Sequence, residues 1–164
     1  MKRTISILVE NEFGALARIA GLFSGRGYNI ESLTVAPTLD DRLSRMTINA
    51  IGNERVIEQI IKQLNRLISV VKVKDITAED PIHRCFALIK INLGKRNRDK
   101  INTMIRPYGG VILEMDDKFS IIQVASEEEK LLQLVNELSP YGIMEFASSG
   151  TLAIQKGKRV FKAS

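Results

Sequence analysis

The chain has few of the side chains on which active sites are most often built. Its 164 residues include one histidine, one cysteine and no tryptophan. A single histidine, His83, argues against a histidine-based metal site and against a serine–histidine triad, because both need partners that the sequence does not supply. Cys85 has no second cysteine for an internal disulfide, which is typical of a reducing compartment. We therefore expect neither a metal centre nor catalytic residues on this chain.

Long apolar runs are also missing. No run approaches the roughly 20 residues that span a membrane. The apolar core of a signal peptide does not follow the first three residues, which lead straight into a short alternating strand. The sequence therefore predicts a soluble, cytoplasmic protein with no membrane partner. Its net charge of +5 permits an acidic partner but does not require one.

What the chain does have is an ordinary globular composition, with 45% hydrophobic and 26% charged residues. Its length suits one medium domain or two small domains of about 80 residues each. Domains of that size are marginal on their own, so we expect them to pack on each other or on a second subunit.

Hydrophobic periodicity predicts six elements in the first half of the chain. They are a strand over 3–9, a helical face at Leu16, Ile19, Ala20 and Phe23, strands over 30–36 and 46–50 around a loop at 38–42, a helical face over 57–68, and a strand over 71–76. Gly27 is suited to stop the first helix and Asn53 to cap the second. The order β-α-β-β-α-β is the ferredoxin-like arrangement.

The same order begins again after residues 77–81 (TAEDP), which are the best linker candidate. Strand-like runs at 85–91, 111–115, 119–125 and 143–147 surround helical faces at 101–108 and 131–138. We predict an α+β protein with two tandem ferredoxin-like (βαββαβ) units. The first domain covers residues 1–78, and the second covers 82–164 and ends in a frayed basic tail from residue 155.

The stretch from Glu10 to Arg18 is the best candidate for a binding site. Gly14 opens the first helix, where unpaired backbone N–H groups and the helix dipole favour an anion. The carboxylate of an amino acid would fit there, with Asn11 and Asn29 as candidate amide partners. Because no nucleophile with a base lies near in the sequence, we interpret this stretch as a sensor site.

Each of these residues also has a plainer interpretation. Gly14 permits a tight turn or close helix packing, and Asn29 is suited to a left-handed turn after Gly27. Arg18 either attracts a carboxylate or is an exposed helical arginine. Arg45 is expected to face solvent or a subunit contact.

An RNA-binding module is the main alternative of another class, because ferredoxin-like sheets bind single strands. That mode stacks bases on aromatic residues of central strands, and aromatics make up only 5% of this chain. The run 94–100 (GKRNRDK) lacks the full spacing of a phosphate loop. We therefore expect no nucleic-acid or nucleotide partner. Salt-sensitive binding to oligonucleotides would reveal one.

Three motifs carry a specific resemblance. Residues 14–24 (GALARIAGLFS), 26–35 (RGYNIESLTV) and 43–48 (LSRMTI) closely resemble the ACT domain of the small, regulatory subunit of acetohydroxyacid synthase, also called acetolactate synthase. The resemblance covers the whole chain and is most specific over residues 8–52. A glycine after the first strand of a βαββαβ unit would by itself indicate only an ACT-like domain.

The resemblance implies a regulatory subunit without an active site of its own, acting in the biosynthesis of valine, leucine and isoleucine. It implies a large catalytic subunit as partner, carrying thiamine diphosphate, Mg²⁺ and FAD, which this chain would activate and place under feedback inhibition by valine. It also implies a homodimer through ACT domains, with valine at the dimer interface. Carried over to this sequence, one protomer would supply Asn11, Gly14, Ala15 and Leu16, and the other would supply Asn29 and Ile30.

Two residues depart from the family pattern. Phe13 stands where proline or a small residue is common, and Ala17 stands where serine is common. Phe13 either crowds the loop or packs over the ligand, and Ala17 removes a hydroxyl from the first helical turn. An ACT sensor of a different kind would bind another amino acid and ignore the catalytic subunit.

Overall fold

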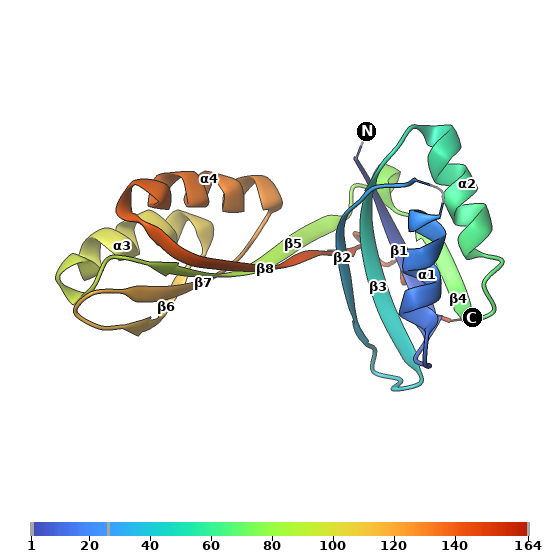
Figure 1. Ribbon diagram of the computed structural model, residues 1–164, viewed down its shortest axis with the longest axis horizontal. Coiled ribbons are helices and arrows are strands. Elements are labelled where there is room, and N and C mark those ends of the chain that lie inside the picture. Colours follow the sequence, from blue (N-terminus) through green and yellow to red (C-terminus); the bar gives the residue numbers. More distant parts are fainter. Residues whose placement is uncertain (1, 26, 164) are drawn as a thin grey trace. The chain divides into compact units, whose positions relative to one another are not determined.

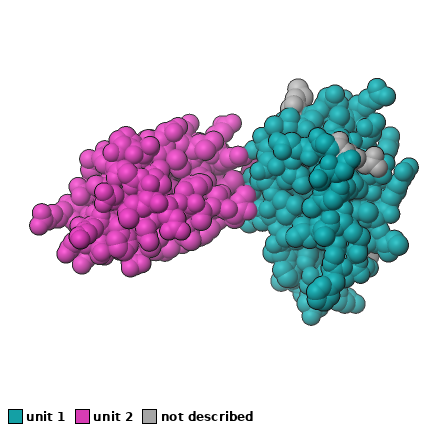
Figure 2. All heavy atoms as spheres, viewed as in Figure 1, with its two compact units in different colours: residues 1–82, 151–164 teal, residues 83–150 magenta. Residues whose placement is uncertain are grey.

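The computed structural model describes residues 2–25 and 27–163 (Figure 1). The chain forms two compact units (Figure 2). The first contains the residues up to Ile82 together with those from Thr151 onward, and the second contains His83–Gly150.

The first unit is a four-stranded antiparallel sheet in the order β2-β3-β1-β4, with both helices on one face (Figure 1). Its elements are β1 (Lys2–Glu10), α1 (Ala15–Ser24), β2 (Ile30–Pro37), β3 (Leu43–Ile51), α2 (Glu54–Leu64), β4 (Val70–Asp75) and the short 3₁₀ helix η1 (Thr77–Glu79). The predicted ferredoxin-like order is confirmed for this unit.

Period-two alternation explains the core of the first unit. Ile5, Ile7 and Val9 of β1 face the helices, where they pack with Ile19 and Phe23 of α1. The second helix begins as expected at its N-cap, Asn53. The side-chain oxygen of Asn53 accepts a 2.9 Å hydrogen bond from the backbone N–H of Val56. The first helix ends at Ser24, before the predicted stop at Gly27. Gly27, at φ +68°, forms the turn beyond the helix.

The second unit repeats the order with the sheet β6-β7-β5-β8. Its elements are β5 (Ile82–Ile91), η2 (Lys95–Asn97), α3 (Arg98–Ile105), η3 (Arg106–Tyr108), β6 (Val111–Met115), β7 (Ser120–Ser126), α4 (Glu128–Leu138), η4 (Ser139–Tyr141) and β8 (Ile143–Ile154). The first residue of β5 and the last four of β8 belong to the first unit. Ala87, Ile89, Ile101 and Leu134 lie in its core. Cys85 is buried in the same core, as is common for a free cysteine.

The end of the chain differs from the sequence-based expectation. We expected residues 155–164 to be a frayed tail of the second domain, but the residues from Thr151 onward belong to the first compact unit. Thr151, Ala153 and Phe161 are buried there. The physical cause is burial: the first sheet offers a surface on which apolar side chains of this segment are removed from water. The last residue, Ser164, lies outside the described residues.

Candidate functional site

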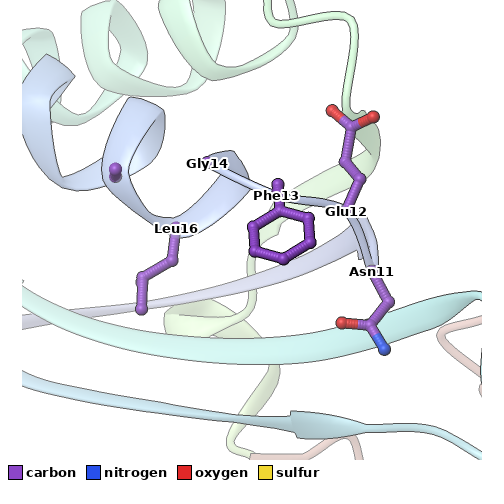
Figure 3. Close-up of a pocket in the computed structure, with 6 residues that line it drawn as sticks. Asn11, Glu12, Phe13, Gly14 and Leu16 are labelled. Carbon is purple, nitrogen blue, oxygen red and sulfur yellow. The ribbon is translucent and has the colours of Figure 1, made fainter.

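A shallow pocket lies where β1 ends and α1 begins. It is lined by Asn11, Glu12, Phe13, Gly14, Leu16 and Ala17 (Figure 3). These residues are consecutive apart from Ala15, whose side chain is buried in the core. The loop therefore presents both polar groups and apolar side chains to the same small opening. Of the expected site residues, Asn11, Gly14 and Leu16 are brought together here.

The start of α1 borders the pocket, and its first N–H, that of Ala15, donates to the carbonyl of Glu12 at 3.3 Å. Gly14 is the N-cap of α1 at φ +80°, a left-handed conformation that favours glycine, and no side chain caps the helix. The first N–H groups of a helix have no partner within the helix, and the dipole makes that end positive. A Cβ atom at position 14 would lie 3.3 Å from Nη1 of Arg18. Gly14 is thus favoured by its left-handed backbone, whereas the Cβ contact would need only a small shift of the flexible Arg18 side chain.

Asn11 is held by the hairpin between β2 and β3. Its backbone N–H donates to the carbonyl of Arg42 at 2.7 Å, and its Nδ2 donates to the carbonyl of Asp41 at 3.0 Å. Its Oδ1 accepts no hydrogen bond within residues 2–25 and 27–163. The amide is therefore fixed by its nitrogen and presents its oxygen, which suits an ammonium group.

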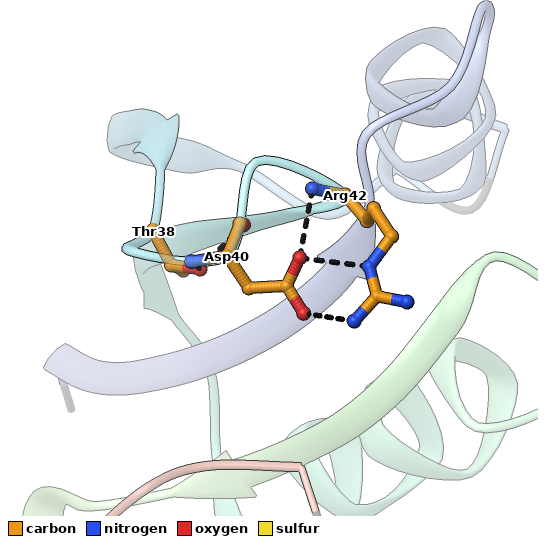
Figure 4. A network of polar contacts seen from close by, with 3 residues as sticks. All are labelled: Thr38, Asp40 and Arg42. Atoms are coloured by element: carbon orange, nitrogen blue, oxygen red, sulfur yellow. Dashed lines mark hydrogen bonds and ion pairs between the residues drawn. The ribbon is translucent and has the colours of Figure 1, made fainter.

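The same hairpin is organised by Asp40 (Figure 4). One carboxylate oxygen accepts from the backbone N–H of Arg42 at 3.1 Å and from its Nε at 2.9 Å, and the other accepts from Nη2 at 2.7 Å. Side-chain and backbone hydrogen bonds from Arg42 lower the pKa of Asp40 from 3.8 to about 2. The charged carboxylate thus bonds to Arg42, the residue whose carbonyl accepts from the N–H of Asn11.

The rim of the pocket carries an ion pair and two exposed apolar side chains. Arg18 pairs with Glu12 across the loop, so the arginine is compensated rather than free. Phe13 is fully exposed, and Leu16 is about half exposed. Burying one such side chain contributes about 1.5–3 kcal/mol. A ligand or a second chain that covers this rim would gain from that burial.

Asn29 and Ile30 lie at the opposite end of the sheet. Ile30 pairs with Ala50, which also pairs with Arg3 near the start of β1. Glu10, just before the pocket, pairs with Leu43. From Ala50 to Leu43 is seven residues along β3, which at about 3.3 Å each gives about 23 Å. One chain therefore does not bring Asn29 to the pocket that contains Asn11.

Sequence reasoning missed the hairpin residues Asp40, Asp41 and Arg42 as parts of the site. It identified 38–42 only as a hairpin loop. The signal that was present is the acidic residue two positions before an arginine, a spacing that lets the side chain bond forward to a backbone N–H. The contact of this hairpin with Asn11 depends on the register of β1 with β3, which the sequence around the hairpin does not reveal.

Two findings concern other kinds of site. Among the described residues, no group of three or more His, Cys, Asp or Glu side chains is placed to hold a metal ion. In that same part of the chain, no helix is long and apolar enough to cross a membrane.

Both halves of the chain match known families. Residues 5–72 match the AHAS small subunit-like ACT domain, and residues 84–157 match the small subunit of acetolactate synthase. The probable acetolactate synthase small subunit of Archaeoglobus fulgidus is 43% identical over 159 residues, which cover 97% of this chain and 99% of that protein. The chain belongs to the acetolactate synthase small-subunit family. The small subunit of acetolactate synthase isozyme 3 of Escherichia coli K12 is 40% identical over 163 residues, covering 99% of this chain and 100% of that protein.

A solved structure supports the same assignment. The crystal structure of the acetolactate synthase small subunit from Thermotoga maritima matches with a TM-score of 0.88 and 30% sequence identity, covering 97% of this chain and 99% of that one. The expected resemblance and the α+β fold of two ferredoxin-like units are therefore confirmed. Of the motifs quoted for the resemblance, only Arg26 lies outside the described residues. Membership in this family supports a regulatory-subunit role beside a catalytic large subunit.

Proposed function

We propose that this small subunit binds valine at the α1 pocket, activates its catalytic subunit, and places that subunit under feedback inhibition. The observation that carries the proposal is the start of α1, which no side chain caps, beside Asn11, whose amide nitrogen donates to the Asp41 carbonyl and whose Oδ1 is available. An α-amino acid has the two matching groups. Its carboxylate fits the helix N–H groups, and its ammonium fits the amide oxygen.

The apolar part of the pocket favours a branched aliphatic side chain. Leu16, Ala17 and Phe13 line the pocket, and each offers only carbon atoms beyond the backbone. A polar or charged ligand side chain would lose water there without gaining a hydrogen bond. Valine, leucine and isoleucine fit this lining, and calorimetry separates them by affinity.

A symmetric dimer through β2 would complete the site with Asn29 and Ile30. β2 lies at an edge of the first sheet, and an edge strand offers unpaired backbone groups to another strand. If two β2 strands pair antiparallel about a two-fold axis, the start of each lies beside the end of the other. Asn29 of one protomer then approaches the partner's β2–β3 hairpin, which holds the partner's Asn11. This geometry supports a two-chain site, because one chain keeps the two asparagines about 23 Å apart.

Regulation would follow from linkage between the small-subunit dimer and its partner. Valine shifts the catalytic subunit between two arrangements only by binding one of them better, and such couplings are typically about 1–3 kcal/mol. In this proposal thiamine diphosphate, Mg²⁺ and FAD all reside on the catalytic subunit. The small subunit supplies effector binding and the contact that transmits it.

The test is a calorimetric titration of the purified chain with L-valine, with D-valine and L-lysine as controls, followed by acetolactate assays with the catalytic subunit. We expect saturable binding of L-valine only, and loss of binding in Gly14→Asp with activation of the partner retained. The substitution places a carboxylate where the ligand carboxylate belongs and forces a side chain into a left-handed conformation. Gly21→Asp is the matched control, since Gly21 is an exposed glycine on the same helix with open space around it. Unchanged valine inhibition in Gly14→Asp would contradict the site assignment.

A further inference from the structure

The C-terminal segment 155–163 is anchored to the first unit by Phe161. This residue is only 8% exposed although its neighbours in sequence are largely solvated. Its ring centroid lies 5.2 Å from Cζ of Arg45 and 5.6 Å from Nζ of Lys72, so it is flanked by two cations. The same cations hold the chain on either side, because Arg45 Nη2 donates to the carbonyl of Ala153 at 3.0 Å and Lys72 Nζ to that of Lys162 at 3.1 Å. In Figure 1 the last described residues lie beside β4, in agreement with the hydrogen bond between Lys72 and Lys162.

The two cations belong to one cross-strand row of the first sheet. Leu8 of β1 pairs with Arg45 of β3 on one side and with Lys72 of β4 on the other. Because Ile7 and Val9 face the helices, Leu8 faces the opposite side of the sheet, yet it is only 3% exposed. Phe161 contacts the cations at the two ends of this row, so it lies on the same outer side of the sheet as Leu8.

Polar contacts add to the apolar anchor. Lys156 pairs with Asp80, Gln155 donates to a carboxylate oxygen of Glu79, and Arg159 Nη1 lies 3.5 Å from that same oxygen. Lys74 and, to a lesser degree, Arg159 lower the pKa of Glu79. These contacts are mostly at the surface and are screened by salt. The buried ring of Phe161 is therefore the contact on which the placement of the segment chiefly depends.

The cross-strand row of Arg45, Leu8 and Lys72 lies immediately before the loop 10–14, which leads into the α1 pocket. Leu8 lies on β1 three residues before Asn11, which follows the end of the strand, and the register of β1 with β4 shifts between Leu8 and Val9. A register shift interrupts the regular ladder. This end of β1 is thus less regularly paired on its β4 side. A chain segment that packs on the outer face of Leu8 would restrict the motion of this end of the strand.

We propose that residues 155–163 form a strap that holds the end of β1 and thereby positions Asn11 for the effector, with Phe161 as the positioning residue. The proposal rests on the function proposed above for the α1 pocket. It makes the C-terminus of the chain part of the regulatory domain. Release of the strap uncovers the Leu8 row and loosens the loop from Glu10 to Gly14, so that effector binding must order this loop first.

The experiment compares Phe161→Ala with Val160→Ala in the full chain. Val160 is the adjacent apolar residue and is 67% exposed, so its truncation removes a side chain from the segment but not from the anchor. Hydrogen exchange of residues 4–14, the dissociation constant for L-valine and the urea midpoint are measured for each variant. We expect faster exchange at residues 8–14 and about fivefold weaker valine binding for Phe161→Ala only. Phe161→Tyr, which keeps the ring, should return both values close to those of the parent chain.

The outcomes separate this proposal from the function on which it rests. Faster exchange confined to residues 155–163, with valine affinity unchanged, overturns the strap. If the parent chain does not bind valine, the proposed function fails, and exchange at residues 8–14 alone then decides whether the segment holds β1. If Phe161→Ala does not fold, Phe161→Leu is used instead, because it keeps apolar volume and loses only the ring face that the cations contact. Unchanged exchange at residues 8–14 in that variant also overturns the proposal.

Discussion

Two variants that are each defective in a different half of the effector site should complement each other when mixed. Asn11→Ala removes the amide at the pocket, and Asn29→Ala removes the one at the far end of the sheet. Because one chain separates these positions by about 23 Å, a two-chain site takes one residue from each protomer. Each homodimer is then defective at both sites, whereas a mixed dimer has one doubly defective site and one intact site.

The size of the recovery follows from counting. Random exchange of equal amounts makes about half of the dimers mixed, and one of their two sites is intact, so about one quarter of all sites should bind with parental affinity. Calorimetry on the separate variants and on the co-refolded mixture measures this fraction directly as the stoichiometry of the tight phase. No tight phase in the mixture, or normal binding by Asn29→Ala alone, would refute the two-chain site.

The same geometry predicts that valine strengthens the dimer. A ligand that binds only the dimer stabilises it by about 2.7 kcal/mol per site at a free concentration one hundred times its dissociation constant. With two sites, dilution in an analytical ultracentrifuge should then give a much lower dissociation concentration with L-valine than with D-valine. Equal dissociation with both enantiomers would mean that the bound ligand does not bridge two chains.

Two further predictions concern the supports of the first unit. The carboxyl group of Asp40 should titrate at about 2 by NMR and closer to 3.8 in Arg42→Gln, which loses the side-chain hydrogen bonds but keeps the one from the backbone N–H. Because the pKa of Asp40 is lowered in the folded state, its contribution to the hairpin is complete above pH 3.8 and is lost as the pH falls through about 2. Valine affinity that varies between pH 5 and 7 because of this group would contradict that assignment. Asn53→Ala should lower the free energy of unfolding by about 1 kcal/mol in urea, because it leaves the Val56 N–H without its 2.9 Å partner. An unchanged urea midpoint would show that water replaces the cap at no cost.

The order of elements was predictable because each one carries its own local signal. Ile5, Ile7 and Val9 alternate along β1, and Asn53 stands where a helix cap is needed. The length of β8 was not predictable from its first residues. We expected a strand over 143–147, but it continues to Ile154, where Thr151 and Ala153 are buried and the carbonyl of Ala153 accepts from the distant Arg45.

The candidate effector site was half predictable, because only some of its residues are marked by local sequence signals. Gly14 and Asn11 are identified by a strand, a turn and a helix start that are adjacent in sequence. The support of Asn11 by the carbonyls of Asp41 and Arg42 depends on the antiparallel register of β1 with β3, which no local pattern specifies. The placement of Phe161 is still less local, since the chain passes through the whole second unit before it returns to Arg45 and Lys72.

Two separate contacts, one observed and one proposed, therefore support the exposed loop 10–14. The β2–β3 hairpin fixes Asn11 from one side through the Asp41 and Arg42 carbonyls, and the proposed strap restrains β1 three residues earlier. A loop that is already ordered loses less conformational entropy on binding than a loop that must be ordered by its ligand. Effector affinity is then set partly by residues that never touch the effector. If so, Asp40→Asn and Phe161→Ala should weaken valine binding by factors that multiply in the double variant, because the two supports share no contact. A double variant no weaker than either single one would mean that both substitutions act through one shared opening of the loop.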